Sequence, residues 1–104
     1  MTFQTIYVKD IAAKQEEENA VILDVRSREE YWEEHWPGAV SYPYNGEDDW
    51  GSRLPMNRTF ILYCGHGGSS MQAARKLGLK GFRVYTVIGG YEIMKKIQEN
   101  YFKY

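Results

Sequence analysis

Short apolar runs alternate with amphipathic stretches along the whole chain, and this alternation limits the folds that the sequence can adopt. The runs are rich in β-branched and aromatic residues, and they lie at residues 5–8, 21–25, 39–42, 60–63 and 84–87. The run at 21–25 is almost continuously apolar, which is typical of a strand buried on both faces. Strands that alternate with helices favour an α/β fold. We therefore predict a mostly parallel five-stranded sheet with helices on both faces.

The stretches between these runs carry start and stop signals for helices. Asp10 and Ser27 are expected to cap helix N-termini, and Glu30 completes a capping box with Ser27. Gly78 is expected to end a helix as its C-cap. The predicted helices cover residues 10–18, 27–35, 70–77 and 91–101. In the last helix, apolar residues recur at helical spacing: Ile93, Met94, Ile97 and Tyr101.

Size and composition are those of a small globular protein. The 104 residues fit a single domain over residues 1–104, and 43 % of them are hydrophobic and 26 % charged. The net charge of −1 lacks the basic excess that nucleic-acid binders carry, so we expect no nucleic-acid partner. The sequence shows neither a secretory signal pattern nor an apolar run long enough to span a bilayer. We therefore expect a cytoplasmic protein that does not act at a membrane.

The only cysteine, Cys64, lies where a predicted strand runs into a glycine-rich segment and then into a helix. One cysteine cannot form an internal disulfide. The glycines at positions 65, 67 and 68 let the backbone curl with its N–H groups inward, as in an anion-binding nest. The following helix adds free N–H groups and the positive end of its dipole. These surroundings favour a thiolate and a nucleophilic role for Cys64. The alternative is a buried structural cysteine.

Three segments together resemble the rhodanese family. Tyr63, Cys64, Gly65, Gly67 and Ser70, followed by Ala73, Ala74 and Leu77, are similar to its active-site loop and helix. The chain also resembles the first signature region of the family, in residues 23–26, 30–31 and 35–40. Residues 81–90 resemble its last strand and the turn into the final helix. The resemblance extends over residues 5 to 100 and implies a rhodanese-like α/β fold.

The resemblance also implies a chemistry. Rhodanese-type sulfurtransferases take a sulfane sulfur from a donor such as thiosulfate onto the cysteine as a persulfide. They pass it to a thiophilic acceptor such as cyanide or a thiol, which includes protein thiols. Here Cys64 would be the nucleophile and carrier, without a metal or an organic cofactor. The backbone of the loop would cradle the outer sulfur; its residues are Gly65, His66, Gly67, Gly68, Ser69 and Ser70.

The composition of the loop separates subclasses of the family. Cys64 to Ser69 has the six-residue length of sulfurtransferases, whereas phosphatase-like members have one residue more. Ser70 stands where the arginine of a cysteine phosphatase is required, which argues against phosphoryl transfer. Many active rhodaneses carry a basic residue at the position of Ser69, but this loop has neither Arg nor Lys. His66 is its only titratable base, and we expect it either to tune Cys64 or the donor, or to face solvent.

Other residues are candidates for supporting roles. Asp24 and Arg26 match an Asp-x-Arg pattern of the family, and we expect structural roles: Asp24 tying the active-site region, and Arg26 pairing with Glu29 or Glu30. Arg53, in the long connection 43–59, could supply the positive charge that the loop lacks or simply be solvated.

Aromatic residues surround these candidates. Tyr91 is expected at the rim of the site. Three rings are expected to pack a helix on the sheet: Tyr31, Trp32 and Trp36. A second group could form a docking patch or ordinary packing: Tyr42, Tyr44 and Trp50.

Two functions other than sulfur transfer stay open at the level of the sequence. The first is a non-catalytic or weakly catalytic binding or regulatory module on the same fold, since a fold does not fix a function. The second is a redox-sensing thiol, which would lack an internal resolving cysteine.

Overall fold

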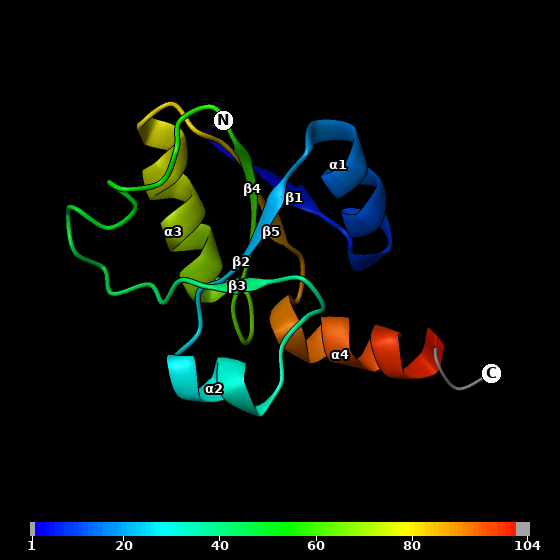
Figure 1. Cartoon of the computed structure of the whole chain (residues 1–104). Coiled ribbons are helices and arrows are strands. Elements are labelled where there is room, and N and C mark those ends of the chain that lie inside the picture. Colours follow the sequence, from blue (N-terminus) through cyan, green and yellow to red (C-terminus); the bar gives the residue numbers. More distant parts are fainter. Residues whose placement is uncertain (1, 102–104) are drawn as a thin grey trace.

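The five apolar runs form one sheet in the computed structural model, which describes residues 2–101 (Figure 1). The strands are β1 (Gln4–Ile6), β2 (Val21–Asp24), β3 (Val40–Ser41), β4 (Thr59–Tyr63) and β5 (Arg83–Val87). Their order in the sheet is β1-β5-β4-β2-β3, and every neighbouring pair is parallel. The predicted fold class and the parallel sheet are confirmed.

Helices cover both faces of the sheet, as predicted. The helical elements are a 3-10 helix, η1 (Val8–Asp10), and the α-helices α1 (Ile11–Glu18), α2 (Arg28–Glu33), α3 (Gly68–Leu79) and α4 (Gly90–Tyr101). Ala73, Ala74 and Leu77 of α3 fill the core on one face. Ile11 of α1 and Met94 of α4 belong to the core on the other face.

Strand β4 divides its side chains between the two cores. Ile61 and Tyr63 point to the core shared with α1 and α4, whereas Phe60 and Leu62 point to the core shared with α3. This division follows from the two-residue period of a strand. All residues of β4 are buried, which explains why the run contains almost no polar residue.

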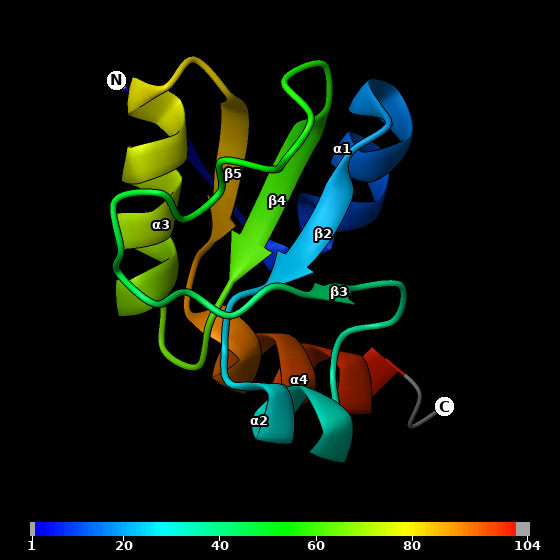
Figure 2. The same cartoon turned by 60° about the vertical axis from the view of Figure 1, so that its left-hand side comes forward.

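The carboxyl ends of the central strands meet at one edge of the sheet. Figure 2 shows β2, β4 and β5 pointing toward the end of the molecule where α2 and the start of α4 lie. The loops that follow these three strands are therefore brought together there, at the edge where open parallel sheets bind ligands.

Helix α2 begins as predicted but ends earlier than predicted. Ser27 and Glu30 form the capping box, with Glu30 N donating to Ser27 Oγ and Ser27 N to Glu30 Oε1. The chain is extended at Glu34, so the helix stops short of His35. The His35 ring instead reaches the Tyr31 carbonyl through Nδ1 at 2.9 Å, taking the acceptor that the backbone N–H of residue 35 would use in a continued helix.

Tertiary contacts correct three expectations about single residues. Val8, expected in the first strand, lies in η1. Gly78 lies inside α3 and does not cap it; a side chain at this position would collide with the backbone of Thr2. Trp32 does not pack on the sheet, because it is 79 % exposed.

Other expectations concern caps and the last helix. Asp10 precedes α1 as expected but makes no side-chain capping bond. In α4, Met94 is fully buried and Ile97 is exposed, while the side chain of Tyr101 lies outside the described part of the structure.

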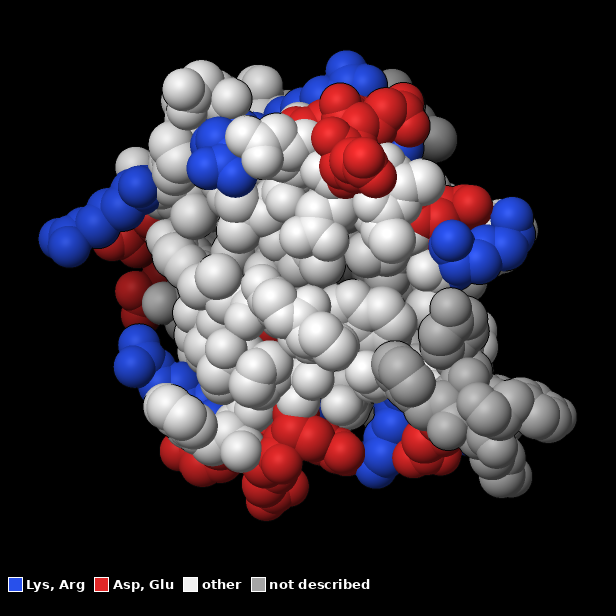
Figure 3. Space-filling model, turned by 45° about the vertical axis from the view of Figure 1, so that its right-hand side comes forward, with Lys and Arg blue, Asp and Glu red and all other residues white. Residues whose placement is uncertain are grey.

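One face of the molecule carries few charges. In Figure 3, Lys, Arg, Asp and Glu side chains gather toward the margins of this face, and its centre is uncharged. Among residues 2–101, no helix is both long and apolar enough to cross a membrane.

Candidate active site

Cys64 lies immediately after β4, at the carboxyl edge of the sheet. It is only 5 % exposed and belongs to the core beneath α3. The chain turns through residues 64–67 and enters α3 at Gly68. The strand, the loop and the helix start therefore hold the sulfur as the sequence predicted.

The loop backbone folds around the sulfur. The N–H of Gly67 donates to Cys64 Sγ across 2.9 Å. Gly67 has a φ of +105°, a conformation that glycine adopts without strain. The N–H groups in the first turn of α3 have no partner within the helix, as at any helix start. A negatively charged sulfur on Cys64 is thus favoured by one direct N–H contact and by the positive end of a twelve-residue helix.

Two buried hydroxyls continue the network behind the sulfur. Ser70 Oγ lies 3.5 Å from Cys64 Sγ and donates to the Gly67 carbonyl at 3.1 Å. Thr86 Oγ1, on β5, donates to Ser70 Oγ at 2.8 Å. Both hydroxyl residues are almost completely buried. Because a hydroxyl can rotate, Ser70 can accept from a thiol or donate to a thiolate without a change in backbone.

The sulfur opens onto a hollow of about 480 Å³, here called the Cys64 pocket. The loop contributes Gly65, His66, Gly68 and Ser69 to its wall, whereas Gly67 and Ser70 are buried beneath the loop. The opposite wall comes from the end of β2, the start of α2 and the chain after β3: Val25, Arg26, Ser27, Glu30 and Tyr44. A small molecule can therefore approach Cys64 from this side.

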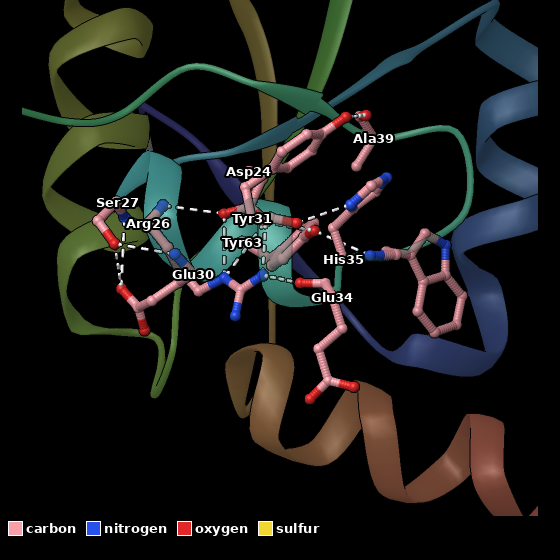
Figure 4. A network of polar contacts seen from close by, with 10 residues as sticks. Asp24, Arg26, Ser27, Glu30, Tyr31, Glu34, His35, Ala39 and Tyr63 are labelled. Carbon is pink, nitrogen blue, oxygen red and sulfur yellow. Dashed lines mark hydrogen bonds and ion pairs between the residues drawn. The ribbon is translucent and has the colours of Figure 1, made fainter.

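Asp24 is the centre of a buried network shown in Figure 4. It is fully buried and accepts bonds from Arg26 through the backbone N–H at 2.9 Å and through Nη2 at 2.8 Å. Tyr63 donates its hydroxyl proton to Asp24 at 2.7 Å and accepts from the backbone N–H of Trp36 at 3.0 Å. Arg26 also donates to the Glu34 carbonyl at 2.7 Å. The residue before Cys64 is thereby tied to β2, α2 and the turn before β3.

Within this network Arg26 is protonated, and its charge is balanced by Asp24. Arg26 pairs with Asp24, so the expected pairing with Glu29 or Glu30 is wrong. Burial opposes its charge, but the hydrogen bond to Asp24 outweighs this and raises the pKa of Arg26. Burial, together with the hydrogen bond to Asp24, raises the pKa of Tyr63 and keeps the phenol protonated. Arg26 lines the Cys64 pocket, yet its charge is already balanced there.

His66 points away from the network behind the sulfur. It is 86 % exposed, and its Nδ1 lies 2.7 Å from Glu92 Oε2 in the first turn of α4. In the described part of the chain, no hydrogen bond joins the imidazole to Cys64. The imidazole therefore lines the pocket without contacting the sulfur directly.

Helix α4 also contacts the active-site loop through its backbone. Tyr91 N donates to the Cys64 carbonyl at 2.6 Å, and Glu92 N donates to the Gly65 carbonyl at 3.2 Å. The Tyr91 ring is buried, stacks on Tyr63 and lies 4.2 Å beneath the Arg26 guanidinium. The expectation that Tyr91 forms the rim of the pocket is therefore wrong.

Arg53 lies in a second hollow beside the Cys64 pocket and not in the pocket itself. The aromatic residues nearby are packed together: the Trp50 ring is buried and meets Tyr42 and Tyr44 edge to face, at 5.3 and 5.0 Å. Within residues 2–101, no group of three His, Cys, Asp or Glu side chains is arranged to hold a metal ion.

The sequence did not predict the contacts that three residues make in the site. Thr86, Tyr63 and Glu92 contact the loop residues or Asp24 from other elements. Thr86 could have been noticed as a hydroxyl inside the apolar run 84–87. Nothing local marks the other two residues as partners, because those contacts join distant parts of the chain.

Comparison with known proteins matches most of this chain to one family. The profile of the rhodanese-like domain family matches residues 7–96. A tRNA sulfurtransferase from Desulfurococcus amylolyticus is 40 % identical over 72 residues, which is 69 % of this chain. The thiosulfate sulfurtransferase GlpE from Coxiella burnetii is 36 % identical over 76 residues, or 72 % of this chain. The chain spans 14 % of the first protein's length and 71 % of the second's.

A solved structure shows the same fold. Reduced CoADR-RHD from Bacillus anthracis superposes with a TM-score of 0.82 at 23 % identity. The match covers 95 % of this chain and 18 % of that protein.

Proposed function

Because this chain belongs to the rhodanese-like domain family, we propose that it is a sulfurtransferase that carries sulfane sulfur as a persulfide on Cys64. One observation carries the proposal. The Cys64 sulfur accepts a hydrogen bond from the Gly67 amide at 2.9 Å, at the start of α3, and opens onto a pocket of about 480 Å³. Such surroundings stabilise an anionic sulfur that a small donor can reach.

Loading of the cysteine is a nucleophilic displacement at sulfur. The Cys64 thiolate attacks the sulfane sulfur of the donor, and the bond between that sulfur and the rest of the donor breaks. With thiosulfate, sulfite leaves with the bonding electron pair and Cys64 becomes a persulfide anion. The Gly67 amide and the helix dipole favour the negative charge both before and after transfer.

Discharge reverses the roles. A cyanide or thiolate acceptor attacks the outer sulfur, the bond to Cys64 Sγ breaks, and the electron pair returns to Sγ. Cyanide leaves as thiocyanate, and a thiolate takes the sulfur as its own persulfide. The Ser70 hydroxyl, supported by Thr86, can turn its proton toward the thiolate that is formed.

The charges that line the Cys64 pocket bear on which donor can load the cysteine. The relative GlpE is named a thiosulfate sulfurtransferase, which supports thiosulfate as one donor here. Against it stands the lack of Arg and Lys in residues 64–70, while Arg26 is already paired with Asp24. A dianion would therefore depend on backbone N–H groups, and we expect an organic persulfide to load Cys64 more readily. The unpaired thiol suits the reducing conditions of a cytoplasm, where we place the reaction.

The mass of the intact protein tests the proposal. Wild type and Cys64→Ser are incubated with thiosulfate, and separately with glutathione persulfide. The expected result is a gain of one sulfur by the wild type alone, removed by cyanide. The ratio of loading rates for the two donors reports whether the loop accepts a sulfonate without a cation.

A different outcome would support the alternative, a binding module on the same fold. In that case neither donor loads Cys64, although the folded wild type reacts with iodoacetamide at this residue and the variant does not.

A further inference from the structure

A second hollow lies beside the Cys64 pocket. It measures about 360 Å³, and we call it the Arg28–Arg53 hollow after two residues of its wall. Two chain segments separate it from the pocket. Ser27 lines the pocket and Arg28 the hollow; likewise, Tyr44 lines the pocket and Tyr42 the hollow.

Backbone hydrogen bonds fix these two segments against each other. Tyr42 N donates to the Asp24 carbonyl at 2.9 Å, and Tyr44 N donates to the Val25 carbonyl at 3.0 Å. Because residues one or two positions apart along these segments line different hollows, the lining residues of the two hollows are separated by roughly 3.5 to 7 Å of extended chain. One extended small molecule can reach both.

The hollow carries the charges that the Cys64 pocket lacks. Arg28 and Arg53 line it together with Glu47 and Asp49. All four residues are exposed, and within residues 2–101 none of their side chains makes a hydrogen bond or an ion pair. In the Cys64 pocket, by contrast, Arg26 is bound to Asp24 and His66 to Glu92.

The inner wall of the hollow is rigid. Trp50 is buried there, packs against Tyr42 and donates its indole N–H to the Pro43 carbonyl at 2.8 Å. The Ser41 hydroxyl, in the same wall, is buried and has no hydrogen-bond partner in the described structure. The wall thus combines a fixed, buried aromatic ring and an unpartnered hydroxyl with two guanidinium groups and two carboxylates that make no ion pair in the described structure.

We propose that the Arg28–Arg53 hollow binds the charged end of a small zwitterionic thiol or its persulfide, an amino-acid or short peptide thiol, while its sulfur reaches Cys64. The guanidinium groups hold its carboxylate, and Glu47 with Asp49 holds its ammonium group. This inference rests on the proposed sulfur transfer and names its partner. The bound thiolate attacks the outer sulfur of the Cys64 persulfide, the bond to Sγ breaks with its electron pair on Sγ, and the thiol leaves as a persulfide.

Discharge of the persulfide to two acceptors tests this assignment. Cys64 is loaded with glutathione persulfide, freed of excess donor, and discharged to glutathione or to uncharged 2-mercaptoethanol. The double variant Arg28→Gln/Arg53→Gln is expected to need about tenfold more glutathione for half-maximal rate. Its rate with 2-mercaptoethanol stays at the wild-type value. Lys96→Gln, an exposed charge on α4 away from both hollows, is the matched control. Equal changes with both acceptors, or no change with either, would overturn the assignment.

A binding measurement decides the site even if Cys64 takes up no sulfur. The unreactive S-methylglutathione is titrated into the ¹⁵N-labelled protein, and the indole N–H signal of Trp50 is followed, with Trp32 and Trp36 as references. We expect a saturable shift of the Trp50 signal in wild type and Lys96→Gln that is lost in the double variant. If Cys64 takes up no sulfur but the Trp50 signal shifts as expected, only the proposed sulfur transfer is refuted. The absence of a Trp50 shift in wild type refutes the binding site.

Discussion

Gly90 allows the start of α4 to pass directly beneath the active-site loop. Its φ is +64°, and a Cβ atom at this position would lie 2.6 Å from the Cys64 carbonyl oxygen and 2.7 Å from that of Gly65. The backbone bonds from Tyr91 and Glu92 to these carbonyls depend on this close approach. Because Gly90 has no side chain, the backbone of α4 can come close enough to hold the loop of Cys64 in position.

Replacing Gly90 by Ala is expected to lower both stability and sulfur loading. The left-handed backbone costs an L-residue about 1 kcal/mol, and the collision with two backbone oxygens adds about 2 kcal/mol more. Gly46→Ala is the matched control, because Gly46 has a φ of +76° but open space around it. Urea unfolding should show a loss of about 1 kcal/mol for the control and about 3 kcal/mol for Gly90→Ala. Equal losses would mean that the close approach is not required.

At the scale of elements, Glu18 joins the end of α1 to β5. Its carboxylate accepts hydrogen bonds from Arg83 Nε at 2.5 Å and from the Tyr85 hydroxyl at 2.7 Å, and Lys14 lies 3.3 Å away. Burial works against the charge of Glu18, but these bonds outweigh it and lower the pKa of Glu18 to about 2. The charged form of Glu18 therefore stabilises the packing of α1 on the sheet.

This pKa predicts a loss of stability in acid. The pKa of Glu18 is lower in the folded than in the unfolded chain, where it has the ordinary value of 4.5. The stabilisation is therefore complete above pH 4.5 and is lost as the pH falls toward 2. We expect wild type to lose about 2 kcal/mol more than Glu18→Gln over this range, since the exposed Arg83 is screened by solvent. Glu17→Gln, an exposed neighbour, should follow wild type in urea unfolding measured from pH 6 to pH 2; identical curves for Glu18→Gln would contradict the account.

At the scale of the whole molecule, β4 is the element on which both cores depend. It lies between β2 and β5, and its side chains enter the core beneath α3 and the core beneath α1 and α4. Strand β3, in contrast, has two residues, pairs only with β2 and lies at the edge of the sheet. Stability should therefore decrease from the centre of the sheet to this edge.

Hydrogen exchange can measure this gradient. Amide protons of residues 60–62 in β4 are expected to exchange only through global unfolding, with free energies within about 1 kcal/mol of the value from urea. Residues 40 and 41 of β3 should exchange through local opening at much lower free energy. Uniform protection across the sheet would show instead that the edge opens only together with the centre.

The sequence alone predicts the features that depend on local residues and on the order of elements along the chain. The alternation of strands with helices predicted the parallel sheet, the spacing of Ser27 and Glu30 predicted the capping box, and the glycines after Cys64 predicted the loop around the sulfur. The capping box and the loop require only residues a few positions apart, and the class of sheet follows from the order of strands and helices along the chain. Local propensity and local hydrogen bonding therefore sufficed to predict them.

Contacts between groups that are distant in the sequence became visible only in the folded chain. Asp24 and Tyr63 are 39 residues apart, and Thr86 is 16 residues from Ser70. The true role of Gly78 and the place of Arg53 in a separate hollow likewise depend on how loops and helices pack. Local periodicity says which side of an element is apolar, but not which polar group of another element lies opposite, because burial is non-directional while a hydrogen bond needs one partner at one distance.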